Sequence, residues 1–288
     1  MKVMVTGAAG MLGREVTAAC HARGHEVVAL ARPALDVTDP AAVDQAISRY
    51  RPDAVVNCAA YTDVDGAEEN EATAMRVNDE GAALLAAAAA SIDAKVLYPS
   101  SDYVFDGSTR RPYLESDIPS ALSAYGRSKQ AGETSVAVAN PRHFIVRSSW
   151  LFGLGGKNFV ETMLRLGAEQ SEVLVVSDQV GCPTYTRHLA RALALLIEGE
   201  EFGIHHVPGG GHCSWYEFAQ EIFDQAGVEC RVMAATTEML ARPAPRPAYS
   251  VLGTERRDPI TLPHWRLGLS AYLRKRELAG GTAAEAVA

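Results

Sequence analysis

The chain has 288 residues, of which 48% are hydrophobic and 22% are charged, and its formal net charge is −8 at pH 7. A chain of this length suits one large α/β domain, or a core domain with a smaller appendage. A nucleic-acid surface needs clustered lysines and arginines. The acidic balance therefore leads us to expect no nucleic-acid partner, although a few local arginines can still bind a phosphorylated small molecule.

Three features bear on where the protein works. The strand-like segment Lys2–Thr6 runs directly into a glycine loop, so we expect no signal peptide. The longest apolar run, Gly81–Ala90, is shorter than the ~20 residues that a membrane span requires. The five cysteines are scattered and show no C-x-x-C spacing, which is typical of reduced thiols. We expect a cytoplasmic protein without a membrane partner.

Short apolar runs alternate with helical patterns over the first half of the chain. Continuous apolar strands separated by helices are typical of a parallel sheet that is covered on both faces. With right-handed crossovers, this predicts an α/β fold with a doubly wound parallel sheet of the Rossmann type. The predicted strands are Lys2–Thr6, Glu26–Leu30, Ala54–Asn57, Lys95–Pro99 and Phe144–Arg147. The predicted helices lie around Leu12–Arg23, Pro40–Tyr50, Glu71–Ser91 and Tyr125–Val138.

The regular alternation weakens after about Trp150, where loop-like, glycine-rich segments become frequent. The helices expected in this half lie near Thr186–Leu196, Trp215–Gln225 and Leu269–Glu277. We predict an NAD(P)-binding Rossmann domain over residues 1–150 and a smaller C-terminal α/β substrate-binding lobe over residues 151–279, partly interleaved with the core. Residues 280–288 are small and are expected to form a flexible tail.

The sequence GAAGMLG follows the first strand and opens the first helix. Glycines let the backbone turn tightly and approach a pyrophosphate, and the helix N-terminus supplies N–H donors. A plain structural turn has the same composition, but the position after an N-terminal strand favours dinucleotide binding. The G-x-x-G-x-x-G spacing resembles the extended short-chain dehydrogenase/reductase superfamily. The predicted cofactor-binding residues of this loop are Gly7, Gly10, Met11, Leu12 and Gly13.

The end of the second strand bears on the choice of cofactor. An acidic residue there would bind the adenosine ribose and disfavour a 2′-phosphate. The chain has Arg32 near this position, which could pair with a 2′-phosphate or be a solvated surface arginine. We therefore expect NADPH, and NADH stays open as the alternative. The other residues expected at the cofactor are Asp36, Val37, Ala60, Tyr61 and Thr62.

Tyr125 and Lys129 lie four residues apart, on one face of a predicted helix. Reduction of a carbonyl needs a proton at the developing alkoxide as hydride arrives. A nearby ammonium lowers the pKa of a tyrosine from its usual ~10 toward the neutral range. The same lysine can bind the nicotinamide ribose, so both residues are predicted to be catalytic and to contact the cofactor. Y-x-x-x-K also arises by chance on exposed helices, so the pair alone is a weak signal.

Ser101 strengthens the interpretation of this pair. It follows the strand Lys95–Pro99, at the carboxyl edge where open α/β sheets bind their ligands. Its hydroxyl can donate a hydrogen bond to a substrate carbonyl and polarise it. The three residues in this order predict an NAD(P)H-dependent oxidoreductase with Ser101 as the third catalytic residue.

A group of potential metal ligands occurs later in the chain, at His205, His206, His212 and Cys213. The glycine-rich run between them favours structural roles, so we predict no metal site there. The carboxylates of an acidic chain suit Mg²⁺ at a subunit interface, but the sequence locates no such ion.

Longer segments resemble the dTDP-4-dehydrorhamnose reductase family across roughly residues 1–275, and together they are more specific than either short motif. The chain has Ser101 where that family usually has Thr, which keeps the hydroxyl, and Tyr249 where Asn is frequent. The similar segments are VNCAAYTDVDGAE (Val56–Glu68), SSDYVFDG (Ser100–Gly107), YGRSKQAGE (Tyr125–Glu133), RSSWLFG (Arg147–Gly153), NFVETMLRL (Asn158–Leu166), SDQVGCPTYT (Ser177–Thr186) and GGHCSWYEFA (Gly210–Ala219).

The resemblance implies that hydride passes from the nicotinamide to C4 of a dTDP-4-keto-6-deoxy sugar, as in the conversion of dTDP-4-dehydrorhamnose to dTDP-rhamnose. It implies that Ser101 polarises the ketone, Tyr125 is the acid and Lys129 is its helper. A homodimer is a further expectation, which the sequence does not test.

The resemblance also implies residues that hold the substrate. Asp102 and Trp150 would line the sugar pocket, with Trp150 offering an apolar face to the 6-deoxy ring, unless its role is ordinary core packing. Arg246 is the candidate cation for the dTDP pyrophosphate.

Other functions share parts of this pattern. A 4-ketoreductase for another nucleotide deoxysugar would carry every motif described above. The resemblance implies that nucleotide-sugar 4,6-dehydratases carry a Thr/Ser-Asp-Glu pattern that begins at the position of Ser101. This chain has Tyr103 in place of the second carboxylate, which favours simple reduction. A non-catalytic NADP-binding regulatory subunit, such as that of methionine adenosyltransferase, shares the fold but does not need the acid Tyr125.

Overall fold

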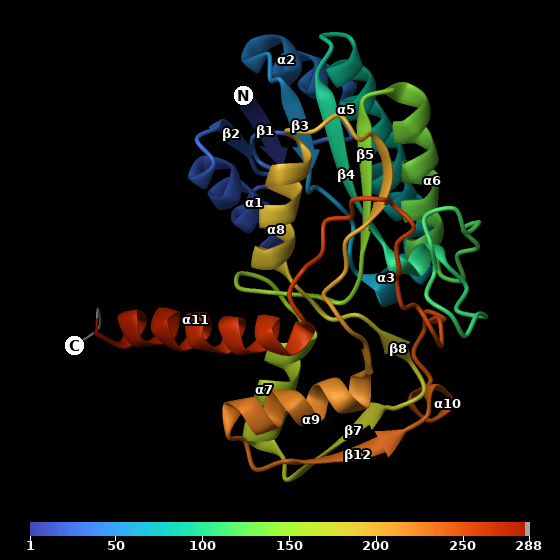
Figure 1. Cartoon of the computed structure of the whole chain (residues 1–288), viewed down its shortest axis with the longest axis vertical. Coiled ribbons are helices and arrows are strands. Elements are labelled where there is room, and N and C mark those ends of the chain that lie inside the picture. The colour runs from blue at the N-terminus through green and yellow to red at the C-terminus, as the bar shows by residue number, and fades with distance from the viewer. Residues whose placement is uncertain (286–288) are drawn as a thin grey trace.

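A central parallel sheet forms from strands whose apolar side chains are buried on both sides. The computed structural model describes residues 1–285, with side chains through Leu278. The six strands lie in the order β10-β5-β4-β3-β1-β2, and every neighbouring pair is parallel (Figure 1). They are β1 (Lys2–Thr6), β2 (Glu26–Leu30), β3 (Ala54–Asn57), β4 (Lys95–Ser101), β5 (His143–Ser148) and β10 (Gly203–His206).

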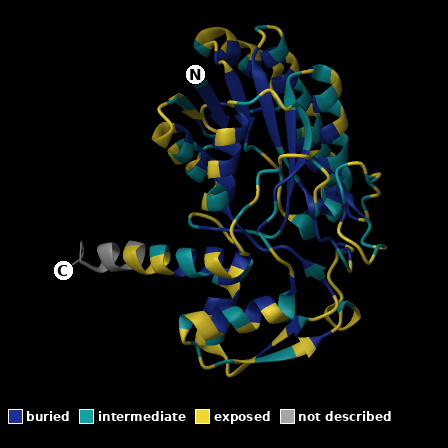
Figure 2. Ribbon diagram, in the orientation of Figure 1, coloured by how far each residue is buried: buried dark blue, intermediate teal, exposed yellow. Residues whose placement is uncertain are grey.

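Helices cover both faces of this sheet, because alternate residues of each strand point to opposite sides. In β1, Val3 and Val5 pack into a cluster with α1 (Met11–Ala22) and α8 (Thr186–Leu196). Met4, between them, packs into a cluster with α2 (Pro40–Tyr50) and α5 (Gly81–Ala90). Helix α6 (Ala124–Ala139) lies beside α5 on this second face. Figure 2 shows the strands as the most deeply buried part of the chain.

The segment expected as one helix, Glu71–Ser91, contains a wider turn in its middle. It is divided into α4 (Glu71–Met75), a π-helical turn (Arg76–Glu80) and α5, and the short α3 (Val64–Glu69) precedes it. Asn78 in the wide turn is fully buried. Its side chain accepts from the Tyr61 amide at 2.8 Å and donates to the Tyr61 carbonyl at 3.0 Å. A π-helical turn contains one residue more than an α-helical turn. The hydrophobic periodicity does not reveal this residue, because apolar side chains line the helix on both sides of it.

A smaller lobe has a second core of aromatic and aliphatic side chains, among them Phe152, Phe218, Trp265 and Tyr272. Its main elements are α7 (Phe159–Glu169), β7 (Glu172–Val176), α9 (Trp215–Ala226), β12 (Arg231–Ala235) and α11 (Trp265–Glu285). Short elements complete the chain: a 3₁₀ turn (Asp102–Val104), β6 (Leu151–Phe152), β8 (Val180–Gly181), β9 (Thr184–Tyr185), β11 (Cys213–Ser214) and α10 (Thr237–Leu240). Figure 1 shows α11 extending away from both lobes.

The predicted fold class, a doubly wound parallel sheet with a smaller α/β lobe, is confirmed. The strands expected in the first half match within two residues at each end. Strand β10 and helix α8 come from beyond residue 150 and still join the larger layer. Helix α11 runs past Gly280, where the sequence predicts a flexible tail, and residues 286–288 lie outside the described residues. Within residues 1–285, no helix is both long and apolar enough to span a bilayer.

The glycine loop after β1 contains a backbone position that only glycine fits. Gly7 has φ 60°, and an added Cβ would lie 2.6 Å from the Ala59 amide nitrogen and the Cys58 carbonyl. Gly24 also has a positive φ, 79°, but among the described residues an added Cβ there would meet nothing within 4 Å. The two positions therefore share left-handed backbone strain and differ in the space around them.

We predict that Gly24→Ala lowers the free energy of unfolding by about 1 kcal/mol, the cost of a left-handed alanine. Gly7→Ala should cost more, roughly 3 kcal/mol or above, because the backbone after β3 must also move. Urea unfolding of both variants measures the difference. Equal losses would contradict the close approach of the loop to β3.

Candidate active site

The carboxyl ends of β1, β3 and β4 meet at one edge of the sheet, where parallel α/β folds bind ligands. The glycine loop at this edge is tied to the end of β2 by a hydrogen bond from the Ala8 amide to the Leu30 carbonyl (3.1 Å). An added Cβ on Gly13 would lie 2.3 Å from the Gly7 carbonyl oxygen, so α1 begins directly against the loop. Within residues 1–285, no side chain caps the N-terminus of α1 at Gly10. The first backbone N–H groups of α1 are therefore available to bind a pyrophosphate.

Met11 and Leu12 follow the loop and point to different surroundings. Leu12 packs against the core below the sheet edge. Met11 contacts the loop after β6, where its Sδ lies 3.9 Å from the side-chain Nδ2 of Asn158. Asn158 also donates to the Gly153 carbonyl at 2.9 Å, so the smaller lobe contacts the start of α1 here.

The residues after β2 differ in how far they are fixed. Val37 is buried against Gly81, whereas Arg32 is exposed. Asp36 accepts from the Thr38 amide at 3.0 Å and from the Thr38 hydroxyl at 2.8 Å. These bonds lower the pKa of Asp36, with smaller contributions from the charges of Arg32 and Arg76. A carboxylate and two cationic side chains thus share this corner of the site.

The segment after β3 carries three further residues expected at the cofactor. Ala60 and Thr62 are exposed. Tyr61 is half-buried, anchored through its backbone by Asn78, and packs in the same apolar cluster as Tyr125. The structure therefore brings this segment against the helix that carries Tyr125 and Lys129.

Helix α6 approaches the end of β4 closely. Ser123 caps the helix by accepting from the Gly126 amide at 3.1 Å. An added Cβ on Gly126 would lie 2.2 Å from the Tyr103 carbonyl oxygen in the turn that follows β4. This contact brings Tyr125 near Ser101, whose side chain affects the pKa of the phenol.

Ser101 is buried at the end of β4. Its hydroxyl donates to Asp102 Oδ1 at 3.1 Å and accepts from the Tyr103 amide at 3.1 Å. Tyr125 packs edge-on against the Tyr103 ring, with 6.1 Å between centroids. Burial raises the pKa of Tyr125 to about 12, and the Ser101 side chain partly offsets this. The phenol is therefore protonated at neutral pH.

Lys129 is buried one turn further along the same face of α6. Its ammonium donates to the Pro99 carbonyl at 2.8 Å and lies 3.8 Å from the centroid of the Tyr98 ring. Burial lowers the pKa of Lys129 to about 7, and the charge of Glu133 partly counteracts that effect. The lowered tyrosine pKa expected from the sequence is therefore wrong for this structure, because burial of the Tyr125 phenol dominates.

Asp102 is buried beside Ser101, on the side of the smaller lobe. Ser250 donates to Asp102 Oδ2 at 2.6 Å. Burial raises the pKa of Asp102 to about 7, although the hydrogen bonds from Ser250 and Ser101 oppose the shift. A carboxyl group that titrates near neutrality therefore borders the hydroxyls of Ser101 and Tyr125.

Two predicted substrate residues already have protein partners. Trp150, with φ 49°, stacks on Trp215 with 3.5 Å between ring centroids and 6° between planes, so one indole face is covered. Arg246 pairs with Asp65 at 3.0 Å, and its charge lowers the pKa of the Tyr103 side chain against the effect of burial. Its charge is therefore shared with a carboxylate near the catalytic tyrosine.

Several buried polar residues near the site were missed by sequence reasoning. Asn78 fixes the Tyr61 backbone, Ser250 holds Asp102, and Glu133 pairs with Arg147 on β5. Of these, only Glu133 had a readable signal, because it lies four residues after Lys129 on one helical face.

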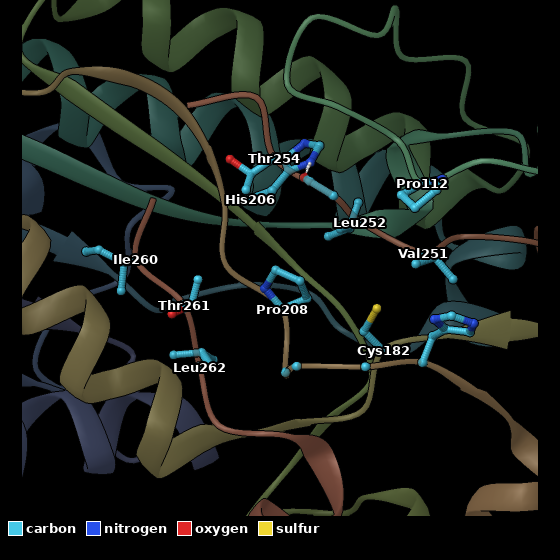
Figure 3. Close-up of a pocket in the computed structure, with 15 residues that line it drawn as sticks. Pro112, Cys182, His206, Pro208, Val251, Leu252, Thr254, Ile260, Thr261 and Leu262 are labelled. Atoms are coloured by element: carbon cyan, nitrogen blue, oxygen red, sulfur yellow. Dashed lines mark hydrogen bonds between the residues drawn. The ribbon is translucent and has the colours of Figure 1, made fainter. Parts of the chain in front are cut away.

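A cavity of about 280 Å³ is lined by residues other than those predicted to be catalytic. Figure 3 shows His206, Cys182 and Leu252 around it, and its described lining does not include Ser101, Tyr125 or Lys129. Metal ligands are also not gathered: among the described residues, no group of three or more His, Cys, Asp or Glu side chains could hold an ion. The Mg²⁺ expectation therefore finds no support in these residues.

Comparison with known proteins identifies the family of the chain. The family described as RmlD substrate binding domain matches residues 1–278. The chain is 47% identical to a dTDP-4-dehydrorhamnose reductase of Streptomyces griseus, over 93% of this chain and 91% of that protein.

Two solved structures of dTDP-4-dehydrorhamnose reductases are also similar. The protein of Clostridium acetobutylicum has a TM-score of 0.93 and 42% identity, over 96% of this chain and 100% of that chain. The protein of Bacillus anthracis, in complex with NADP, has a TM-score of 0.93 and 38% identity, over 95% of this chain and 99% of that chain. The chain therefore belongs to the dTDP-4-dehydrorhamnose reductase family.

Proposed function

We infer that the protein reduces the C4 ketone of a dTDP-4-keto-6-deoxy sugar with NADPH, and that its substrate is dTDP-4-dehydrorhamnose. The observation that carries this function is the convergence of Ser101, Tyr125 and Lys129 at the carboxyl end of β4, beside a glycine loop shaped for a pyrophosphate. The similarity to named dTDP-4-dehydrorhamnose reductases, one of them bound to NADP, supports the same substrate and cofactor.

Ser101 and Tyr125 act on the ketone oxygen in this reaction, and Lys129 binds the nicotinamide ribose. When bound, the nicotinamide supplies the hydride that adds to C4. Ser101 donates a hydrogen bond to the ketone oxygen and polarises it. Tyr125 gives its proton to that oxygen, because the developing alkoxide is a stronger base than a phenolate. Because the pKa of Tyr125 is near 12, the phenol is protonated and can donate before each turnover.

The remaining site residues are proposed to bind rather than react. The loop residues Gly7, Gly10 and Gly13 hold the pyrophosphate of NADPH, and Arg32 pairs with its 2′-phosphate. Asp102 contacts the sugar. Trp150 contributes an edge to the sugar pocket, because Trp215 covers one of its faces.

Arg246 would bind the dTDP pyrophosphate only by sharing its charge between that group and Asp65. We also propose a cytoplasmic homodimer, with residues 151–279 forming the lobe that binds the sugar nucleotide. Size measurement in solution tests the dimer.

We predict that Tyr125→Phe lowers turnover of dTDP-4-dehydrorhamnose by ~10²–10⁴-fold, because the proton donor is lost. NADPH affinity should stay within a few-fold of the unmodified protein. Absorbance of NADPH measures the first effect and its fluorescence measures the second. Tyr103→Phe is the matched control: it removes a neighbouring phenol and should keep the larger part of the activity. Undiminished turnover in Tyr125→Phe would sink the mechanism, whereas an unmodified protein that binds NADPH without turning the sugar over would favour a binding subunit.

A second prediction concerns the exposed Arg32. Arg32→Asp should reverse the preference from NADPH toward NADH by at least tenfold in kcat/KM, since a carboxylate repels the 2′-phosphate and binds the ribose hydroxyls. Arg49→Asp on α2 makes the same change of net charge and should leave the ratio as it is. If both variants kept the original ratio, Arg32 would not contact the cofactor.

A further inference from the structure

A row of polar side chains crosses the sheet one position before the catalytic Ser101. Ser100 on β4 is in register with Arg147 on β5, and Arg147 is in register with His206 on β10. Residues in register on parallel strands point to the same face of a sheet. Arg147 and His206 are both buried, so this row lies under protein rather than in water.

Helix α6 contributes a charge to this row. Glu133 Oε2 and Oε1 accept from Arg147 Nη2 at 2.7 Å and Nε at 2.9 Å, and Ser100 donates to Oε1 at 2.6 Å. The side chains of Arg147 and Glu133 are only 1% and 6% exposed. A buried ion pair contributes little net stability compared with apolar residues of similar size. Another role is therefore the better explanation for this pair.

The pair lies next to the catalytic machinery on two elements. On α6, Tyr125, Lys129 and Glu133 follow one another at four-residue intervals, along one helical face. On β4, the Pro99 carbonyl accepts from Lys129 and the next residue, Ser100, donates to Glu133. Two consecutive residues of β4 thus fix the position of α6 along the strand.

The far end of the row reaches the smaller lobe's connecting segments. His206 Nε2 lies 3.3 Å from Arg147 Nη1, and His206 Nδ1 lies 2.8 Å from the Gly253 carbonyl. Because an arginine can only donate, Nε2 accepts and Nδ1 carries the proton. Burial lowers the pKa of His206, in keeping with this neutral form. Figure 3 shows His206 at the wall of the cavity of about 280 Å³.

We propose that Glu133 is a positioning residue that acts through Lys129: its carboxylate keeps the lysine ammonium charged and directed at the active site, while Arg147 holds the carboxylate and limits its effect. This inference rests on the proposed role of Lys129 in the reduction.

The surroundings of Lys129 leave Glu133 as its principal counter-charge. Tyr98 from β4 and Cys58 after β3 lie near it, and Tyr125 lies one turn earlier on α6. Burial raises the pKa of each, so all three are neutral at pH 7. Further charged groups in the surrounding elements are Asp79 in the π-helical turn, Asp102 after β4 and Arg147 on β5. Burial lowers the pKa of Lys129, and Glu133 gives the largest opposing contribution.

The test compares charge changes of opposite sign. In the pH profile of kcat/KM for the sugar, the fall at high pH (the alkaline limb) should report loss of the Lys129 proton in the free enzyme. Glu133→Gln removes the anion and leaves Arg147 unpaired, so the limb should move to lower pH by about one unit. Arg147→Met leaves the anion without its partner, so the limb should move to higher pH by a similar amount. Glu133→Asp should restore the limb, and Ser100→Ala, which changes no charge, should leave its position unaltered.

A purely structural pair would lower kcat in both variants without shifting the limbs in opposite directions, and that result would overturn the proposal. If Arg147→Met does not fold, Glu133→Gln/Arg147→Met replaces it, since removal of both charges is better tolerated than removal of one. The limb of this double variant should lie above that of Glu133→Gln, and coincident limbs would also overturn the proposal.

Lys129→Met separates this inference from the proposed function. Full activity in that variant would contradict the role of Lys129 itself. An inactive Lys129→Met, together with unshifted limbs in the Glu133 variants, would contradict the inference alone.

Discussion

The close packing of α6 against β4 is the contact on which the active site depends. Two glycines with ordinary helical conformations permit it, one where α6 meets the turn after β4 and one where α6 meets the π-helical turn. An added Cβ on Gly126 would lie 2.2 Å from the Tyr103 carbonyl oxygen, and one on Gly132 would lie 2.1 Å from the Asn78 carbonyl oxygen. Backbone atoms cannot yield as the end of a flexible side chain can. The absence of these two methyl groups therefore sets the distance between Tyr125 and Ser101.

Burial follows from this packing and decides the electrostatics of the site. With water excluded, the charged form of each group becomes costly, which raises the pKa of Tyr125 and Asp102 and lowers that of Lys129. Local partners oppose these shifts: Ser250 donates a hydrogen bond to Asp102, and the charge of Glu133 acts on Lys129. Both of these partners lie outside the short motifs by which such a site is found in a sequence.

The sequence predicted the sheet well because its strands are short apolar runs between helices, and Lys2–Thr6, Glu26–Leu30 and Ala54–Asn57 have the expected bounds. Ser101, Tyr125 and Lys129 were also predictable, because their spacing places them at one strand end and on one helix face. The smaller lobe was less predictable: β7 pairs with β12 from a distant part of the chain, and no local pattern reveals that partner. The pKa of Tyr125 was misjudged because a spacing shows which charge is near, but not how much water is excluded.

Trp150 shows how the two lobes are joined. It lies between β5 of the large sheet and β6, and its φ of 49° is a conformation that costs a tryptophan roughly 1–3 kcal/mol. Stacking on Trp215, at the start of α9, offsets part of that cost. The direction in which the chain leaves the sheet is thus set by a pair of indole rings, one from each side of the junction. A sugar nucleotide that touched this pair would also bear on the angle between the lobes.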